Sequence, residues 1–309
     1  MKAKVIVAMV AVVLAGWTAG TARADFSLYG SEQLTVNGSH VNGGLYNQSK
    51  AWVVSGGGVL YLYTNNTSTV NISGGTVSQP RAYDTSTVNL SDGSMSRLEA
   101  YDASTVNMSG GEGTMLYAYD TSTVKMSGGT VNDLRAYNSS AVDMSGGTAW
   151  TYLGAYDTST VKMSGGTVKT NLYAKGTSTV AISGGTVSWL VPQDSSTVNI
   201  SGGSAGCLVP LDSSTVNISG GTVSSLDARN TSTVTFDGQD FILGTGLSLK
   251  SDRVLGTGTL SGKWFDGTAW AVNISRNDTS ATIRAIPEPA TLSLLALGGL
   301  AMIRRRRGR

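Results

Sequence analysis

The sequence predicts an all-β fold, a single-stranded parallel β-helix with about 18 residues and three short strands per coil. The first observation is a phrase, Ser-Thr-Val-Asn-Ile-Ser-Gly-Gly-Thr-Val at residues 68–77, that recurs down most of the chain. A fixed period of this length is typical of a solenoid. The second is strict alternation of apolar and polar residues within the phrase, and the third is the glycine pair that follows it.

The first strand of each coil carries apolar residues at its first and third positions, which is the period of a strand with one buried face. The first position recurs every 18 residues, except for steps of 19 at 142→161 and 161→180. We predict twelve coils that begin at Leu34, Trp52, Val70, Val88, Val106, Val124, Val142, Val161, Val180, Val198, Val216 and Val234. The first two coils diverge from the others, as terminal repeats do.

The rest of each coil supplies the corners and two further strands. A glycine pair such as Gly74-Gly75 lets the chain turn by using positive φ. A second strand carries valines such as Val77, and a third carries leucines such as Leu98, followed two residues later by a small residue such as Ala100. A polar Asp/Asn-Thr/Ser-Ser-Thr turn closes the coil. Identical positions are expected to stack about 4.8 Å apart along the axis.

The chain divides into four segments. Residues 1–24 have a basic start, an apolar run and an Ala22-Arg23-Ala24 cleavage pattern, which predict a secretory signal peptide. Residues 25–235 are the repeat domain. Residues 236–286 leave the period and are expected to form antiparallel strands, including Ala269–Ile274 and Ala281–Ile286, as a small C-terminal β cap around Trp264 and Trp270. Residues 287–309 form a tripartite tail.

That tail has a short motif, an apolar segment over 290–303 that is short for the roughly 20 residues of a membrane span, and an arginine cluster. Arginines after an apolar segment act as a stop-transfer signal. The motif residues are Pro287, Glu288 and Pro289, and the cluster includes Arg304, Arg305, Arg306 and Arg307.

Over Pro287–Arg309 the tail resembles the PEP-CTERM sorting signal of Gram-negative bacteria. The resemblance implies recognition of Pro287, Glu288 and Pro289 by an exosortase, a membrane protease that cuts near this motif. It also implies transient insertion of the C-terminal transmembrane helix in the inner membrane, export to the cell surface or exterior, and association with exopolysaccharide. A permanent tail anchor without processing is the alternative.

The repeat itself resembles the β-helices of bacterial autotransporter adhesins, and this resemblance favours a right-handed helix. Left-handed hexapeptide helices space their apolar residues by 6, whereas this chain spaces them by 2, 5, 3 and 2. The calcium-binding nonapeptide β-roll needs Gly-Gly-x-Gly-x-Asp twice per coil, and here each glycine pair occurs once with no Asp after it.

Charge and composition narrow the function classes. The chain has net charge +2, but residues 25–289 hold 14 Lys and Arg against 20 Asp and Glu, a net of −6. An acidic mature chain has no footprint for nucleic acid. The single cysteine, Cys207, excludes an internal disulfide, and the single histidine, His40, excludes histidine-rich metal sites. We therefore predict no cofactor and no metal site.

Two ladders of side chains are candidate sites. The closing turns carry an Asp/Asn ladder that Gly176 interrupts, and it either bonds backbone groups of its own turn or binds Ca²⁺. Its members are Asn66, Asp84, Asp102, Asp120, Asn138, Asp157, Asp194, Asp212 and Asn230. The second ladder either stacks on itself or offers a carbohydrate-contact strip. It consists of Tyr83, Tyr101, Tyr119, Tyr137 and Tyr156.

Two functions from different classes remain. The uniform coils and the sorting tail favour a non-enzymatic structural or adhesin-like protein of the cell surface or extracellular matrix. The alternative is a polysaccharide-active β-helix enzyme, a lyase or glycosidase, which would need charged residues in a groove formed by long loops. The coils have insertions of only one residue, near 150–152 and 169–171, and their nearest charged cluster is Asp157, Lys162 and Lys169.

Overall fold

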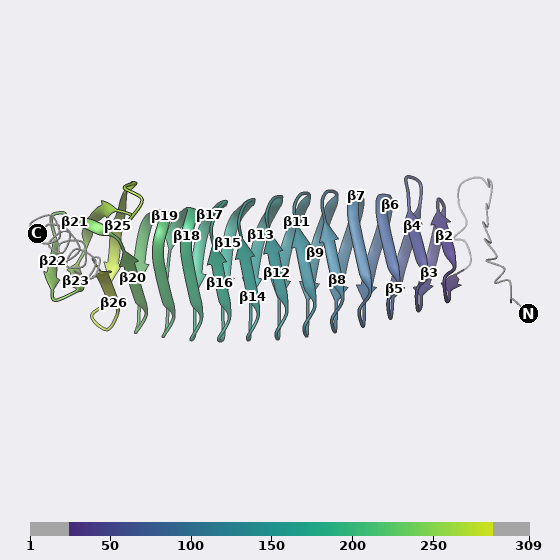
Figure 1. The fold of residues 1–309 in the computed structure, drawn as a ribbon, viewed down its shortest axis with the longest axis horizontal. Helices are drawn as coiled ribbons and strands as arrows, with labels where there is room; N and C mark the ends of the chain where they lie inside the picture. The colour runs from purple at the N-terminus through teal and green to yellow at the C-terminus, as the bar shows by residue number, and fades with distance from the viewer. Residues whose placement is uncertain (1–24, 287–309) are drawn as a thin grey trace, which may run out of the picture.

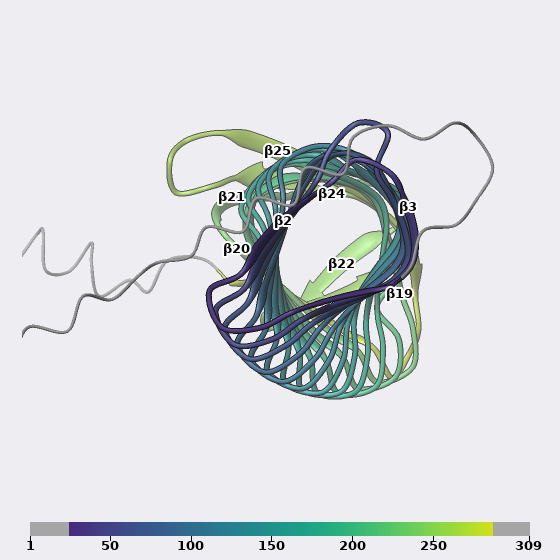
Figure 2. The same cartoon turned by 90° about the vertical axis from the view of Figure 1, so that its right-hand side faces the viewer.

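The computed structural model describes residues 25–286, and the regular structure of these residues consists entirely of β-strands. The strands wind into one long rod (Figure 1), and the coils stack around a common axis (Figure 2). In Figure 1 the nearer strands run upward, the farther strands run downward, and the chain advances from right to left. These directions define a right-handed helix. The stacked coils confirm the predicted parallel β-helix.

Each coil has a first side, formed by the Ser-Thr-Val strand, and a second side after the glycine corner. The strands confined to the first side are β2 (Gln33–Val36), β4 (Lys50–Val53), β8 (Thr105–Met108), β10 (Thr123–Met126), β12 (Ala141–Met144), β14 (Thr160–Met163), β16 (Thr179–Ile182) and β20 (Thr233–Asp237). Those confined to the second side are β1 (Phe26–Leu28), β3 (Ser39–Leu45), β5 (Gly58–Thr64), β9 (Glu112–Ala118), β11 (Thr130–Ala136), β13 (Thr148–Ala155), β15 (Thr167–Ala174) and β17 (Thr186–Pro192).

Four longer strands pass through the glycine corner and contribute to both sides. They are β6 (Thr69–Ala82), β7 (Thr87–Ala100), β18 (Thr197–Leu208) and β19 (Thr215–Ala228). The strands of these coils pair in parallel with the equivalent strands of the next coil, for example Val124 of β10 with Val142 of β12. The ladder of backbone hydrogen bonds therefore runs along the rod axis.

The expected count of three strands per coil is wrong in one respect. The second and third segments are continuous in strands such as β11, and β11 keeps one register with β9 from Val131 to Asp133, where we expected a corner. The reason is that neighbouring coils bend at the same residue, so parallel hydrogen bonding continues through the bend. Most coils therefore contain two strands, the second of which is bent.

The core consists of ladders of valine, isoleucine, leucine, methionine and alanine that are almost completely buried, as the repeat predicts. Val124, Met126, Val131, Leu134 and Ala136 of one coil are each at most 1% exposed. Burial of one such Val, Leu or Met side chain contributes about 1.5–3 kcal/mol. Each coil contacts only its neighbours, so stability accumulates coil by coil.

The predicted start of the second coil is wrong by one residue. Ala51, not Trp52, pairs with Leu34 in the preceding coil and with Val70 in the next. Ala51 is fully buried, whereas Trp52 lies on the outer face beside Asn71. A shift of one residue exchanges the two faces of a strand, and the small alanine rather than the indole occupies the buried position.

The corner at Gly128-Gly129 uses glycine at both positions for different reasons, although Asp92 occupies the first position in one other coil. A Cβ on Gly128 would lie 2.2 Å from the carbonyl oxygen of Ser109 in the preceding coil. Gly129 has φ of 76°, which L side chains rarely adopt. The repeat fixes both glycines because the corner brings one coil's backbone directly against the next.

After β20 the chain leaves the solenoid, forms four strands, and then returns to it. The excursion contains β21 (Gln239–Leu243), β22 (Leu247–Lys250), β23 (Arg253–Gly256) and β24 (Gly258–Lys263), and the return contains β25 (Ala269–Asn277) and β26 (Thr282–Ile286). β25 pairs in parallel with β19 and completes the twelfth coil, and β26 pairs in parallel with β20 and begins a thirteenth. The prediction that these two segments form only antiparallel strands is therefore wrong.

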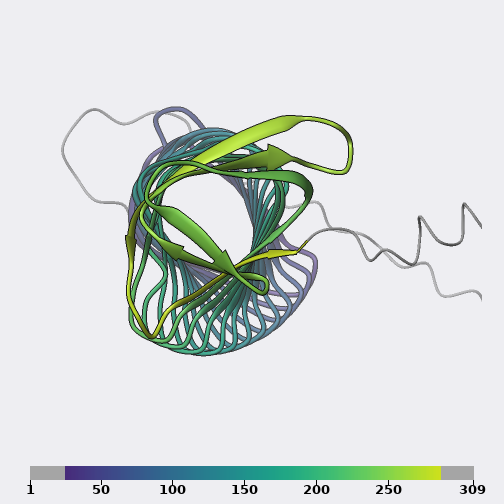
Figure 3. The same cartoon turned by 90° about the vertical axis from the view of Figure 1, so that its left-hand side faces the viewer.

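The excursion covers the end of the rod, as Figure 3 shows. β24 pairs antiparallel with β25, and β23 with β26, so both returning strands have partners on their outer edges. Trp264 and Trp270 stack with centroids 4.8 Å apart, and Trp270 stacks on Phe236 at 5.0 Å. Pairing of exposed strand edges prevents their association with other chains.

The predicted signal peptide, residues 1–24, and the tripartite tail, residues 287–309, lie outside the described residues. Within residues 25–286 there is no helix long and apolar enough to cross a membrane.

Candidate functional site

The Asp/Asn ladder occupies a backbone conformation that few residues tolerate. Asp84, Asp102 and Asn138 have φ between 55° and 57°, in the left-handed region where Asn and Asp are the common non-glycine residues. Gly176, the apparent interruption, has φ of 70° at the same turn position. The ladder is therefore a series of identical left-handed turns, and its residue types follow from the backbone.

The side chains of this ladder bond the neighbouring coil rather than their own turn. Oδ2 of Asp84 accepts a hydrogen bond from the backbone N–H of Asn66 at 2.8 Å, and Oδ2 of Asp102 accepts one from Asp84 at 3.0 Å. Gly176 donates in the same way to Oδ2 of Asp194 at 2.9 Å. The expectation of bonds within one turn is corrected to bonds between coils, because stacking places each carboxylate beside the N–H of the turn before it.

A ladder of buried serines, which the sequence reasoning assigned to a polar turn, lies next to the Asp/Asn ladder. Oγ of Ser122 donates to the carbonyl oxygen of Ala100 at 3.1 Å and accepts from the N–H of Tyr119 at 3.0 Å. The ladder is fully buried and comprises Ser49, Ser68, Ser86, Ser104, Ser122, Ser140, Ser159, Ser178, Ser196, Ser214 and Ser232. Its signal in the sequence was the constancy of serine where neighbouring turn residues vary.

The five predicted tyrosines form one continuous stack. Neighbouring ring centroids are 4.9 to 5.1 Å apart and ring planes differ by 7° to 16°. The members in order are Tyr83, Tyr101, Tyr119, Tyr137 and Tyr156. Both faces of each internal ring are covered by another tyrosine, so a sugar ring has access only to ring edges and hydroxyl groups. Carbohydrate contact by this strip stays a prediction.

A network of charges lies beside the tyrosine stack. Glu99 is 4% exposed and forms ion pairs with Arg81 at 2.9 Å and Arg97 at 2.6 Å. Asp133 pairs with Arg135 at 2.6 Å and accepts a hydrogen bond from the Tyr117 hydroxyl at 3.1 Å. The arginines and carboxylates neutralise one another locally, as partly buried charges require.

This environment keeps two tyrosine hydroxyls protonated at unusually high pH. Burial raises the pKa of Tyr101 to about 12, and the nearby Glu99 carboxylate raises it in the same direction. Burial also raises the pKa of Tyr117 to about 12, with a further contribution from Asp133. Both effects disfavour the tyrosinate anion.

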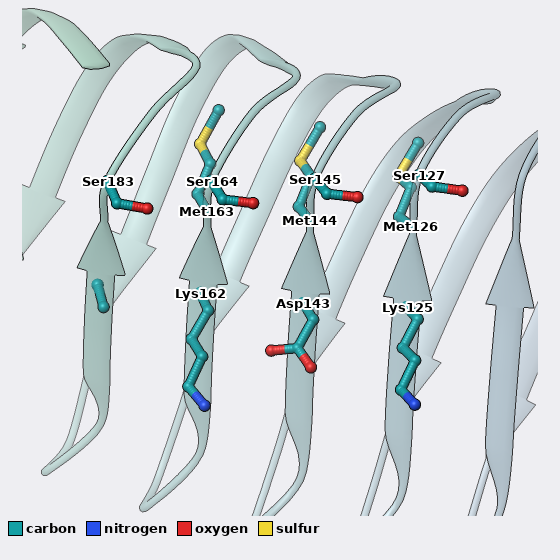
Figure 4. A pocket seen from close by; sticks show the side chains of 11 residues that line it. Lys125, Met126, Ser127, Asp143, Met144, Ser145, Lys162, Met163, Ser164 and Ser183 are labelled. Carbon is teal, nitrogen blue, oxygen red and sulfur yellow. The ribbon is translucent and has the colours of Figure 1, made fainter. Parts of the chain in front are cut away.

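A shallow hollow of about 510 Å³ lies over the first side of the central coils. Its charged residues are Lys125, Asp143 and Lys162, which lie on successive strands in Figure 4. The structure does not place Lys162 with the other two members of the predicted charged cluster. Asp157 accepts a hydrogen bond from the N–H of Asn138, and Lys169 lies over the ring of Trp150.

The described residues contain no group of three or more His, Cys, Asp or Glu that is arranged to hold a metal ion. The ring of His40 makes an edge-on contact with Phe26 at 5.2 Å between centroids. Burial raises the pKa of the Cys207 thiol, which keeps it in the less reactive protonated form. Cys207 is partly exposed and lies between Trp189 and Ser225 in the ladder of neighbouring coils.

Comparison with known families adds one finding, which concerns the tail. Residues 285–307 match the PEP-CTERM protein-sorting motif. The chain is a β-solenoid with a PEP-CTERM sorting motif. The matched range includes Pro287, Glu288 and Pro289 together with Arg304–Arg307, whose individual roles stay predictions. No curated protein and no solved structure matches the chain.

The PEP-CTERM motif indicates an exported, surface-associated protein that an exosortase sorts. The matched range and the described strands overlap only at residues 285–286, because the last described strand, β26, ends at Ile286.

Proposed function

We propose that this protein is a non-enzymatic structural or adhesin-like rod of the bacterial cell surface or extracellular matrix, associated with exopolysaccharide. The observation that supports it best is the use of each coil's side chains to bind the next coil. Turn carboxylates accept neighbouring N–H groups, buried serines bond neighbouring carbonyls, and tyrosines stack on one another. The polar and aromatic side chains of this chain therefore stabilise the rod.

The rod also has the surface of a matrix component. Asparagine side chains on the first side hydrogen-bond from coil to coil, for example Asn89 to Asn71 and Asn107 to Asn89, both at 2.8 Å. Threonines and serines flank these asparagines, so this part of the first side is rich in hydrogen-bonding groups. A face of this kind suits many weak contacts with a hydrated polymer rather than one deep binding site.

The alternative function is a polysaccharide lyase or glycosidase that acts in the hollow over the first side. Glycoside hydrolysis ordinarily uses two carboxyl groups that flank the bond, and the hollow has one carboxylate, Asp143. The test is incubation of purified protein with exopolysaccharide from its host, followed by size-exclusion chromatography. Depolymerisation that disappears in Asp143→Asn or Asp157→Asn would refute the structural role.

The export route predicts a defined mature protein. The intact mass of the protein recovered from outside the cells of its native host should match a chain that begins at residue 25 and ends at about 287–289, after cleavage near the motif. We propose that anchoring in the inner membrane is transient. A form found only in membranes with Arg304–Arg307 retained would instead make this a permanently anchored surface protein.

A further inference from the structure

An exposed aromatic surface lies on the outer side of three consecutive second-side strands. We call it the aromatic face, and it consists of Trp150 and Tyr152 of β13, Tyr173 of β15 and Trp189 of β17. Trp150 is 51% exposed and Trp189 is 49% exposed. Exposed indoles gathered on one face are characteristic of binding surfaces, because Trp and Tyr dominate interaction energies.

The aromatic face coincides with the two consecutive steps of 19 residues, 142→161 and 161→180. In β13 the ladder pairs Ala149 with Val168 and resumes at Tyr152 with Asn171, so both coils contain one additional residue at this place. The register changes there against β11 and β17, which carry no such residue. β-Bulges redirect side chains and are common beside functional sites. The additional residues lie between Ala149 and Tyr152 and between Val168 and Asn171, the same short stretches that contain the exposed Trp150 and Lys169.

Cationic groups lie over the aromatic rings. Nζ of Lys169 is 5.7 Å from the centroid of Trp150, and Nζ of Lys175 is 5.3 Å from that of Tyr173. The Arg135 guanidinium is 5.6 Å from the centroid of Tyr152, and Arg135 also pairs with Asp133. No Asp or Glu occurs in β13, β15 or β17. The face is therefore locally positive on a rod whose mature charge is −6.

We infer that the aromatic face binds an acidic polysaccharide, with apolar sugar faces on Trp150 and Trp189 and sugar carboxylates near Lys169 and Lys175. The inference rests on the proposed association with exopolysaccharide and specifies its site and its chemistry. The two tryptophans are two coils apart, about 10 Å along the axis, so a polymer that runs along the rod meets both. The aromatic rings supply apolar contact area and the lysines supply selection for negative charge.

A nucleic acid fits this face less well. A nucleic acid strand carries one phosphate every 3.4 Å or so, and its binding depends on neutralising several of them with Lys or Arg. Here a few cations are set in a strongly acidic rod, which repels a polyanion of that density. A polysaccharide with at most one carboxylate per sugar ring meets a weaker repulsion and gains contact with the indoles.

The test is affinity electrophoresis and isothermal titration of the released protein with polygalacturonate, with neutral dextran as the comparison polymer. The variants are Trp150→Ala/Trp189→Ala and Lys169→Glu. Phe265→Ala is the matched control, because Phe265 is 42% exposed in the loop between β24 and β25. We expect both variants to weaken polygalacturonate binding about tenfold or more and the control to leave it unchanged. Circular dichroism should show the same strand content in all forms.

The outcomes separate this inference from the proposed function. Wild-type protein that binds polygalacturonate or host exopolysaccharide with no loss in either variant would overturn the aromatic face and leave exopolysaccharide association intact. Wild-type protein that binds neither polymer would refute both. Equal binding of dextran and polygalacturonate would refute the selection for negative charge, and tighter binding of single-stranded oligo-dT than of polygalacturonate would refute the polysaccharide as ligand.

Discussion

Removal of one hydroxyl group from the buried serine ladder should destabilise the rod measurably. Ser122→Ala deletes the Oγ that donates to the Ala100 carbonyl and accepts from the Tyr119 N–H. Each such intramolecular bond contributes about 1 kcal/mol net. The Tyr119 N–H also donates to the Ala100 carbonyl at 2.8 Å, so neither backbone group is left without a partner. We therefore expect a loss of about 1–2 kcal/mol in the free energy of unfolding.

The same chain supplies the control. Ser232 is equally buried, yet its Oγ has no hydrogen-bond partner in the described structure, and the following coil has Ala281 at the equivalent position. Ser232→Ala should therefore be neutral or slightly stabilising. Urea unfolding followed by circular dichroism, with hydrogen exchange to locate the opened coils, measures both variants. Equal losses in the two variants would refute the assignment of stability to these hydrogen bonds.

Two further predictions concern the glycine corners and the tyrosines. Gly128→Ala should lower the urea midpoint far more than Gly267→Ala, because its Cβ would meet the Ser109 carbonyl oxygen at 2.2 Å whereas nothing lies within 4 Å of a Cβ on Gly267. Gly267 has φ of 87°, so its substitution reports the backbone strain alone, and a loss at Gly267 equal to or larger than that at Gly128 would refute the prediction that crowding dominates. Tyr101 and Tyr117 bind their protons more tightly in the folded chain, with pKa of about 12 against about 10 unfolded. The contribution of these raised pKa values to folding stability should be present below about pH 10 and lost as the pH rises towards 12. Unfolding midpoints measured against pH, together with ultraviolet titration of tyrosinate, test this prediction. Titration of every tyrosine near pH 10 would contradict it.

The repeat predicted the solenoid and nearly all of its core, because each coil has the same pattern of buried and exposed positions. An error at one apolar position is corrected by the equivalent position in other coils. The second coil shows the limit of this argument. The sequence of this coil diverges, so the other coils do not define its register. Only the size of the buried site distinguishes Ala51 from Trp52. The thirteenth coil was missed for a related reason, since the excursion from β21 to β24 separates it from the period.

The candidate sites divide in the same way. The positions of the Asp/Asn ladder and the tyrosine stack followed from spacing alone, since equivalent residues of a solenoid lie above one another. The hydrogen-bond partners of the carboxylates could not be predicted from the spacing, because the left-handed turn directs each side chain toward the previous coil. The sequence contained one unused clue: Asn, Asp and Gly176 share the ability to adopt positive φ, which points to backbone conformation rather than to metal binding.

A regular solenoid separates structural residues from residues with another role. Where a side chain bonds or stacks on its equivalents, as Asp102 and Tyr119 do, repetition explains its presence. Where a coil departs from the repeat and exposes costly apolar area, packing gives no reason for the departure. The bulges that contain Trp150 and Lys169 are departures of this kind, and they lie on the rod itself rather than on the sorting tail. Binding at the destination is therefore best sought where the repeat is broken.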